Sequence, residues 1–199
     1  MNKGIENIPQ KIRDLYEIHE WKHAVAVLSR DFPQEWNDIL YVLENFRLLR
    51  SSILKPGGRK SPISERIDGM FAARGWKERR FETSIHVDDE SHDSPTHNVD
   101  YYKNKVAVET EWNNKDPFYD RDLNNFRLLH QLDVISVGVI ITRADSLQDI
   151  FKRLGPKIAR KYGAATTHMS KLIPKMDGGG AGGCPVLAFG ITKNLYVED

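Results

Sequence analysis

The sequence predicts a mixed α/β protein built on a central sheet. The segment 134–142 is nearly all apolar and β-branched, which is typical of a strand that is covered on both faces and lies inside its sheet. The segment 106–112 alternates apolar and polar residues, as a strand with two different faces does. Other segments, such as 31–49 and 61–74, repeat apolar residues at helical spacing.

Length and composition favour one intracellular domain. A chain of 199 residues can bury a sizeable core, and nothing in it demands a second domain, so we expect a single domain over 1–199. The net charge of +1 does not by itself indicate nucleic acid, although acids and bases can be segregated over one surface. Cys184 is the only cysteine, and the sequence has no signal-peptide pattern and no run of membrane-helix length. We therefore expect a cytoplasmic protein.

The elements of the first quarter can be assigned in order. Residues 9–20 have no clear pattern, and 23–28 fits either a strand or a short helix. A helix is expected over 31–49, with an apolar stripe that we assign to the core. A flexible basic loop over 55–60 follows it.

A second helix is expected after this loop because of the residues at its two ends. Ser61 is a favoured N-cap, Pro62 suits the first helical position, and Gly75 suits the C-terminal cap. The later elements are expected to be a strand over 81–87, an exposed polar loop over 88–96, a helix over 120–132, a central strand over 134–142, a helix over 145–154 capped by Asp145, a short helix over 168–175, a mobile glycine segment over 178–183 and a last buried strand over 185–191.

Three acids fall together on one predicted hairpin. A tight turn at Lys103-Asn104 would pair Asp100 with Ala107. Directly opposed residues share a face of the sheet, so Asp100 would lie diagonally beside Glu109, roughly 5–8 Å away. Glu111 is two residues further on and points the same way.

The three acids predict a metal site. Carboxylates so close repel one another unless a cation lies between them. Hard oxygen ligands that leave room for water favour Mg²⁺, which can promote attack on a phosphodiester. A glycosidase is a poor alternative, because adjacent acids on one face of a strand do not flank a glycosidic bond.

The acids Asp100, Glu109 and Glu111 resemble the site of the PD-(D/E)xK nucleases, and more closely that of the type II restriction endonucleases of the BglII, BstYI and BamHI group. The third position is Lys in most of the superfamily, Gln in BglII-like members and Glu in BamHI-like ones, so this triad is BamHI-like. The blocks Ser61-Pro62-Ile63, Arg74-Gly75-Trp76-Lys77-Glu78 and Leu172-Ile173-Pro174-Lys175 also resemble the group, in the same order.

The resemblance implies a restriction-endonuclease-like core, in which a central mixed sheet has helices on both sides. It also implies that Asp100 and Glu109 hold Mg²⁺ with help from the main-chain carbonyl of Thr110, and that Glu111 orients or deprotonates the attacking water. Glu78 is a weaker candidate for a fourth acid.

The resemblance further implies a homodimer that cuts double-stranded DNA at a short palindrome, each subunit cutting one strand. The site is weakly favoured to be a six-base palindrome with a GATC core. A companion DNA methyltransferase would protect the host's own sites. The helix over 119–132 is our candidate for part of the dimer interface, because its apolar residues exceed one stripe.

Two segments are predicted to contact DNA, and the glycine segment 178–183 could either approach DNA closely or serve as a linker. Arg59, Lys60 and Ser61 combine two cations with the backbone amides of a helix start, which suits a phosphate. The segment 164–171 carries side chains that can reach phosphates or base edges, although its threonines can equally cap the next helix. Its candidate DNA-binding residues are Thr166, Thr167, His168 and Lys171.

Two other functions stay open from the sequence. One is a nuclease of the same fold with low sequence specificity, acting in repair or defence. The other is a non-catalytic DNA-binding module whose acids are merely solvated. The bands produced from a plasmid would separate the first from a restriction enzyme, and a metal titration would separate the second.

Overall fold

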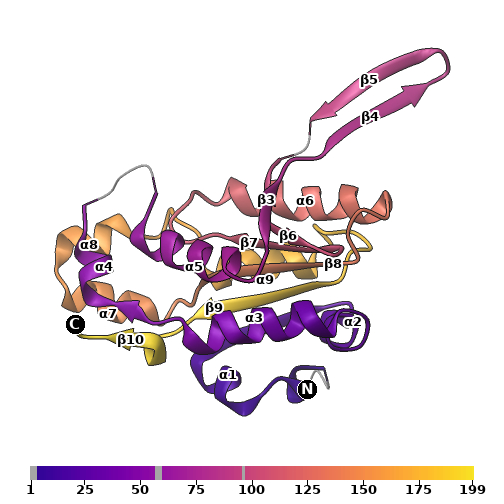
Figure 1. The fold of residues 1–199 in the computed structure, drawn as a ribbon. Coiled ribbons are helices and arrows are strands. Elements are labelled where there is room, and N and C mark those ends of the chain that lie inside the picture. The colour runs from indigo at the N-terminus through magenta and orange to yellow at the C-terminus, as the bar shows by residue number, and fades with distance from the viewer. Residues whose placement is uncertain (1–3, 57–59, 96) are drawn as a thin grey trace.

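The centre of the molecule is a six-stranded mixed sheet in the order β1-β9-β8-β7-β6-β3 (Figure 1). The structure is a computed structural model that describes residues 4–56, 60–95 and 97–199. The three inner strands β7, β8 and β9 are parallel, and the outer pairings are antiparallel. The strands of this sheet are β1 (Tyr16–Trp21), β3 (Lys77–Arg79), β6 (Val99–Lys103), β7 (Val106–Thr110), β8 (Val137–Arg143) and β9 (Val186–Ile191).

Strand β8 occupies the interior position that its apolar sequence predicts. All seven of its residues are buried, and it pairs with β7 on one side and β9 on the other. Its side chains alternate between two cores. Val139 and Ile141 face the core under one layer of helices, and Ile140 faces the core under the other.

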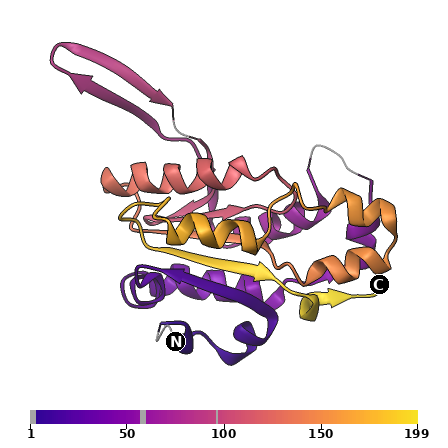
Figure 2. The same ribbon diagram turned by 180° about the vertical axis from the view of Figure 1, so that it is seen from behind.

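Helices cover both faces of the sheet, as expected (Figures 1 and 2). The larger core contains residues of α1, α2, α3, α5 and α7, whereas α6 and α9 pack on the opposite face. The helices are η1 (Ile5–Asn7), α1 (Gln10–Leu15), α2 (Ala24–Asp31), α3 (Pro33–Asn45), α4 (Arg50–Leu54), α5 (Pro62–Ala72), α6 (Pro117–Gln131), α7 (Leu147–Arg153), α8 (Pro156–Lys161), α9 (Met169–Asp177) and η2 (Lys193–Leu195). Two short strands, β2 (Leu48–Leu49) and β10 (Tyr196–Val197), form a separate parallel pair.

The contact between α6 and the sheet depends on a glycine. A Cβ atom built on Gly138 of β8 would lie 2.4 Å from the ring of Phe126, which belongs to α6. The absence of a side chain therefore lets α6 approach β8 closely. This approach brings the N-terminal turns of α6 over the end of β7, where the acidic residues lie.

Helix α5 has the ends that its sequence predicts. The backbone N–H of Ser64 donates to Ser61 Oγ over 3.0 Å, so Ser61 is the N-cap. Gly75 follows the helix with φ +79°, a left-handed conformation that glycine adopts without strain.

Two local predictions outside the acidic hairpin are wrong. The predicted loop over 88–96 is instead a turn and a strand as far as residue 95, because β5 (Glu90–Pro95) pairs with β4 (Glu82–Val87) in a hairpin that projects from the body (Figures 1 and 2). Residue 96 lies outside the described residues. The glycine segment forms neither a helix nor a strand but a set of hydrogen-bonded turns, with Gly180 N donating to Lys175 O over 2.9 Å. Asp145 does not cap α7, because its carboxylate accepts from Ser170 instead.

Helix α6 uses most of its apolar residues within its own subunit. Leu123, Phe126 and Leu129 are buried in the core between α6, α9 and the sheet. Leu132, just past the helix end, is 52% exposed. In the described ranges, no helix has both the length and the apolar character needed to cross a membrane.

Candidate active site

The acids lie on the hairpin β6–β7. Its turn lies one residue later in the chain than the sequence predicts, so the two strands pair in a different register. Tyr102 pairs with Ala107, and Lys103 pairs with Val106. The turn is therefore Asn104-Lys105, both of which have positive φ (42° and 64°), as a type I′ turn requires. Continuing this register by two residues places Asp100 directly opposite Glu109 rather than diagonal to it.

The side chains of Asp100 and Glu109 are both held by backbone N–H groups of the hairpin. The N–H of Asp100 donates to Glu109 Oε2 over 3.3 Å, and the N–H of Thr110 donates to Asp100 Oδ2 over 3.0 Å. Glu109 is 1% exposed, and its Oε1 is buried with no hydrogen-bond partner in the described part of the chain. The two carboxylates thus share one end of the hairpin, and one of their oxygens lacks a protein partner.

Glu111 lies just beyond the end of β7 and is held at both its main chain and its side chain. Its N–H donates to Ile141 O over 2.9 Å, which continues the pairing with β8. Its carboxylate accepts from Asn114 Nδ2 over 2.7 Å and from a guanidinium nitrogen of Arg121 over 3.3 Å. The side chain is only 2% exposed, so its charge is poorly solvated.

A fourth acid of this cluster, Asp122, was not predicted. It lies on α6 with no exposed surface, and its Oδ1 accepts from Arg121 over 2.8 and 2.9 Å. Its Oδ2 is buried and accepts no hydrogen bond from an N–H or hydroxyl group of the described residues, but the carboxyl groups of Asp122 and Glu111 lie close enough to share a proton. Arg121 therefore links Asp122 to Glu111. The only sequence signal was an Arg-Asp pair near the start of a helix, which is too common to indicate a site.

Burial and mutual repulsion raise the pKa values of the acids. Desolvation is the main cause for all four, and the charge of Asp122 is the next contribution for both glutamates. The pKa of Asp100 is raised to about 6 and that of Glu111 to about 9. The pKa of Glu109 is raised well above its ordinary value. Such a cluster stores electrostatic free energy that a bound cation would release.

A cleft of about 370 Å³ opens beside the acids. Asp100, Glu111 and the N-terminal end of α5 line it, together with Lys60 and Arg121. Acids at the floor and cations on the walls suit a ligand that carries phosphate and is attacked next to a metal.

The donor chemistry of the acids fits a hard divalent cation. Glu109 Oε1 and Asp122 Oδ2 accept no hydrogen bond from an N–H or hydroxyl donor of the described residues, and such carboxylate oxygens need a cation or a proton. Among the described residues, no three acidic, histidine or cysteine side chains are arranged as ligands around one point. Mg²⁺ does not require three, because it is usually held by one or two carboxylates and completes its shell with water and substrate oxygens.

Glu78 lies apart from the acid cluster. It is an exposed residue of β3, and its carboxylate accepts from Asn98 Nδ2 over 2.8 Å. Its negative charge contributes to a raised pKa of Lys60, for which the hydrogen bond to Asp68 is the main cause. The structure therefore brings Glu78 near the wall of the cleft but not into contact with Asp100 or Glu109.

The expected phosphate site at the start of α5 borders the cleft. Lys60 and Ser61 both line the cleft, and Lys60 forms an ion pair with Asp68. The Lys60 side chain is 58% exposed, which leaves it available to a phosphate. Arg59 lies outside the described residues.

The two threonines of the segment 164–171 are used internally. Thr167 has no exposed surface, and its hydroxyl donates to Glu111 O over 3.3 Å. The expectation that Thr167 contacts DNA does not fit this burial. Thr166 donates to Gly163 O over 2.7 Å and accepts from Arg143.

His168 and Lys171 are partly buried and paired with acids. His168 Nδ1 lies 2.7 Å from Asp145 Oδ1, beside a second cleft of about 240 Å³. Burial lowers the pKa of His168, so its neutral form is favoured. Lys171 Nζ lies 2.5 and 2.6 Å from the carboxylate oxygens of Asp116, and its side chain is 23% exposed.

Comparison with known proteins gives one family. The model of the family described as restriction endonuclease BglII/BglIII matches residues 16–191, which is most of the chain and includes Asp100, Glu109, Glu111 and Asp122. No curated protein matches the chain significantly.

Proposed function

We propose that this chain cleaves DNA with the help of Mg²⁺. The chain belongs to the BglII/BglIII restriction endonuclease family and is therefore a type II endodeoxyribonuclease that binds double-stranded DNA. Enzymes of this kind generally use a divalent metal. The observation that carries the proposal is the gathering of Asp100, Glu109 and Glu111 beside a cleft with cationic walls. The partnerless oxygen of Glu109 supports a cation at this place.

In the proposed site, Asp100 and Glu109 hold Mg²⁺ with help from the main-chain carbonyl of Thr110. When bound, Mg²⁺ supplies positive charge that favours attack on the phosphodiester and stabilises the charge of the transition state. Asp100 is oriented for this task by the N–H of Thr110, and Glu109 by the N–H of Asp100. Both acids lose their protons when the cation binds, because a carboxylate must be ionised to act as a ligand.

Glu111 would orient the attacking water and accept its proton. Burial and the charge of Asp122 raise the pKa of Glu111 to about 9, so its carboxyl is protonated at neutral pH until a cation binds and lowers that pKa. The ionised form is the one that would accept the proton of the water. Asn114 and Arg121 each donate to one of its oxygens, which fixes the direction of the carboxylate. Arg121 also supplies the nearest positive charge.

The proposed assembly is a homodimer that recognises a short palindrome. The two-fold axis of the protein would coincide with that of the site, so each subunit would cut one strand. Helix α6 remains the candidate for part of the interface, and Leu132 at its end is an exposed apolar residue there. A companion DNA methyltransferase would protect host sites of the same sequence.

DNA contacts are proposed at four described positions on the rim. Lys60 and Ser61 would contact phosphate at the start of α5, and Lys171 would do so after leaving or sharing Asp116. His168 would contact a base edge or a phosphate.

The decisive experiment is digestion of plasmid DNA with Mg²⁺, followed by sequencing of the ends. We expect discrete bands whose ends share one palindromic sequence. A smear would favour the nuclease of low specificity. Absence of cutting, together with absence of heat on titration with Mg²⁺ or Ca²⁺, would favour the non-catalytic module.

A further inference from the structure

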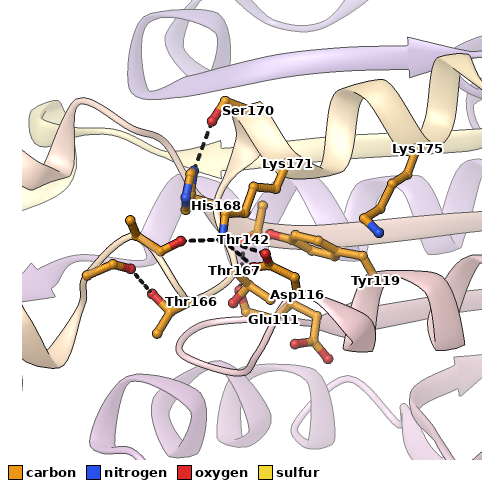
Figure 3. A network of polar contacts seen from close by, with 12 residues as sticks. Glu111, Asp116, Tyr119, Thr142, Thr166, Thr167, His168, Ser170, Lys171 and Lys175 are labelled. Carbon is orange, nitrogen blue, oxygen red and sulfur yellow. Dashed lines mark hydrogen bonds and ion pairs between the residues drawn. The ribbon is translucent and has the colours of Figure 1, made fainter.

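The segment 163–171 is joined to the active-site segment 111–116 by a series of polar contacts that the proposed mechanism does not use (Figure 3). Lys115 and Thr166 form an antiparallel backbone bridge. The N–H of Thr167 donates to Asn114 O over 2.9 Å. Lys171 closes the connection by its ion pair with Asp116.

Thr167 lies at the centre of this connection and reaches Glu111 by two routes. Its hydroxyl donates directly to the main-chain carbonyl of Glu111 over 3.3 Å. Its N–H holds Asn114, whose side-chain amide donates to Glu111 Oε2 over 2.7 Å. One residue therefore contacts the main chain of Glu111 and orients the group that binds its carboxylate.

The carbonyl of Glu111 has a second hydroxyl donor that belongs to the rigid sheet. Thr142 of β8 donates to it over 2.7 Å and lies 2.6 Å from the hydroxyl of Tyr119. Both threonines are buried, with exposed fractions of 1% for Thr142 and 0% for Thr167. Thr142 thus fixes Glu111 to the sheet, whereas Thr167 fixes it to the segment that carries His168 and Lys171.

We infer that Thr167 is a positioning residue that makes the placement of Glu111 depend on how the segment 163–171 is seated. The inference rests on the proposed role of Glu111. When His168 and Lys171 meet their DNA partners, the segment is held and Glu111 is aligned. On a duplex with a wrong base pair the segment is displaced, and the short hydrogen-bonded path carries that displacement to Glu111.

The test uses Thr167→Val, which keeps the shape of the side chain and removes its hydroxyl. We expect the single-turnover cleavage rate on the cognate duplex to fall roughly three- to tenfold, the effect of one lost hydrogen bond on alignment. Affinity for the same duplex in Ca²⁺ should not change. Thr167→Ser keeps the hydroxyl and should restore most of the rate.

Coupling between the segment 163–171 and Glu111 predicts a specific result. The variant should discriminate less between the two duplexes in cleavage rate, but equally well in affinity. For Thr167→Val, the ratio of cleavage rates on the cognate duplex and on one with a changed base pair should fall. The ratio of affinities should stay the same. Thr142→Val removes the hydroxyl that belongs to the sheet, so it should slow both duplexes equally and leave the ratio of rates unchanged.

Thr192→Val is the matched control, because Thr192 also donates to a main-chain carbonyl, that of Leu15 over 2.7 Å, far from the site. It should lower the melting temperature without changing the cleavage rate.

An unchanged rate in Thr167→Val, or an equal slowing in Thr192→Val, would overturn the inference and leave the role of Glu111 intact. Near-normal cleavage by Glu111→Gln would instead overturn the proposed function. If Thr167→Val does not fold, the test uses Thr167→Ser, which keeps the hydroxyl. The inference is then wrong if Thr167→Ser discriminates less than the wild type between the two duplexes in cleavage.

Discussion

The two long hairpins of this protein are both rich in acids, yet they place them in opposite environments. On β4–β5 the acids Asp88, Asp89 and Glu90 lie at the tip and are exposed. On β6–β7 the acids lie against the body, where Glu109 is 1% exposed. The two hairpins are close in sequence, and the exposed one carries more acids than the buried one. The packing of α6 over the sheet is what separates them, because it buries one set of acids and leaves the other in water.

This comparison shows that acid content alone does not define a site. An exposed carboxylate is stabilised by water and needs no partner. A buried one needs a proton, a hydrogen-bond donor or a cation, and the described residues offer no N–H or hydroxyl donor to Glu109 Oε1 or Asp122 Oδ2. The cation is expected only where this shortage exists.

The largest expected difference between the hairpins is the effect of removing one charge. Asp100→Asn should slow cleavage by at least about a hundredfold, since a metal ligand is worth several kcal/mol of transition-state stabilisation. Asp89→Asn is the same change on the exposed hairpin and should leave cleavage normal. Gel assays at saturating Mg²⁺ measure both, and binding in Ca²⁺ should persist in Asp100→Asn. Near-normal cutting by Asp100→Asn would remove the catalytic assignment from β6–β7.

A change of Glu111 tests whether the third acid is specific to this site. Glu111→Gln should slow cleavage by about a hundredfold or more while metal binding persists, because general-base help is typically worth about 10² to 10⁴ in rate. Glu111→Lys introduces the residue that is commoner in the wider superfamily, next to Arg121, and should also be inactive. Single-turnover rates and calorimetric Mg²⁺ titration measure the two effects. Substantial cutting by Glu111→Lys would show that this position accepts either charge.

The buried acids should also make stability fall as pH rises, in the absence of metal. A carboxylate whose folded-state pKa is raised binds more protons folded than unfolded, so stability is lost from the unfolded pKa up to the folded one. That window runs from the ordinary value of 3.8 to about 6 for Asp100, and from 4.5 to about 9 for Glu111. Glu111→Gln should therefore be more stable than the wild type at pH 9, by on the order of 1–3 kcal/mol.

Denaturant titrations at pH 5, 7 and 9 without metal measure this pH effect. Mg²⁺ should restore the stability lost at high pH, because it replaces the protons. Glu90→Gln, on the exposed hairpin, is the matched control and should follow the wild type at every pH. If Glu111→Gln is no more stable than the wild type at pH 9, the protein itself offsets the cost of burying the ionised acids.

The smallest expected effects concern the two lysines proposed near phosphate. Lys60→Ala should reduce the slope of log affinity against log salt by about one, the effect of one phosphate contact. Lys171→Ala should reduce it less, because the acid Asp116 already neutralises this lysine. Affinities for cognate and scrambled duplexes in Ca²⁺ at several salt concentrations measure both. An unchanged slope for Lys60→Ala would remove the start of α5 from the DNA surface.

The sequence by itself determined the features that depend on near neighbours. The apolar run 134–142 indicated an interior strand, because no exposed strand tolerates such a run, and β8 is interior. The alternation after Val106 fixed which face Glu109 and Glu111 share. Ser61 marked a helix start because an N-cap bonds to an amide three residues away. The family followed from motifs of this local kind, and the family match confirms it.

Only the tertiary structure decided which side chains are buried together. Asp122 joins the acids because Gly138 lets α6 lie close to β8, and no local pattern reports that approach. Thr167 was expected at the DNA surface and is instead enclosed against Glu111, 56 residues earlier in the chain. Burial and long-range hydrogen bonds depend on how distant segments pack, and the pKa values of the site depend on that burial. The sequence therefore predicts which residues are acidic and which face of the strand they share, whereas the fold sets the electrostatic environment of those residues.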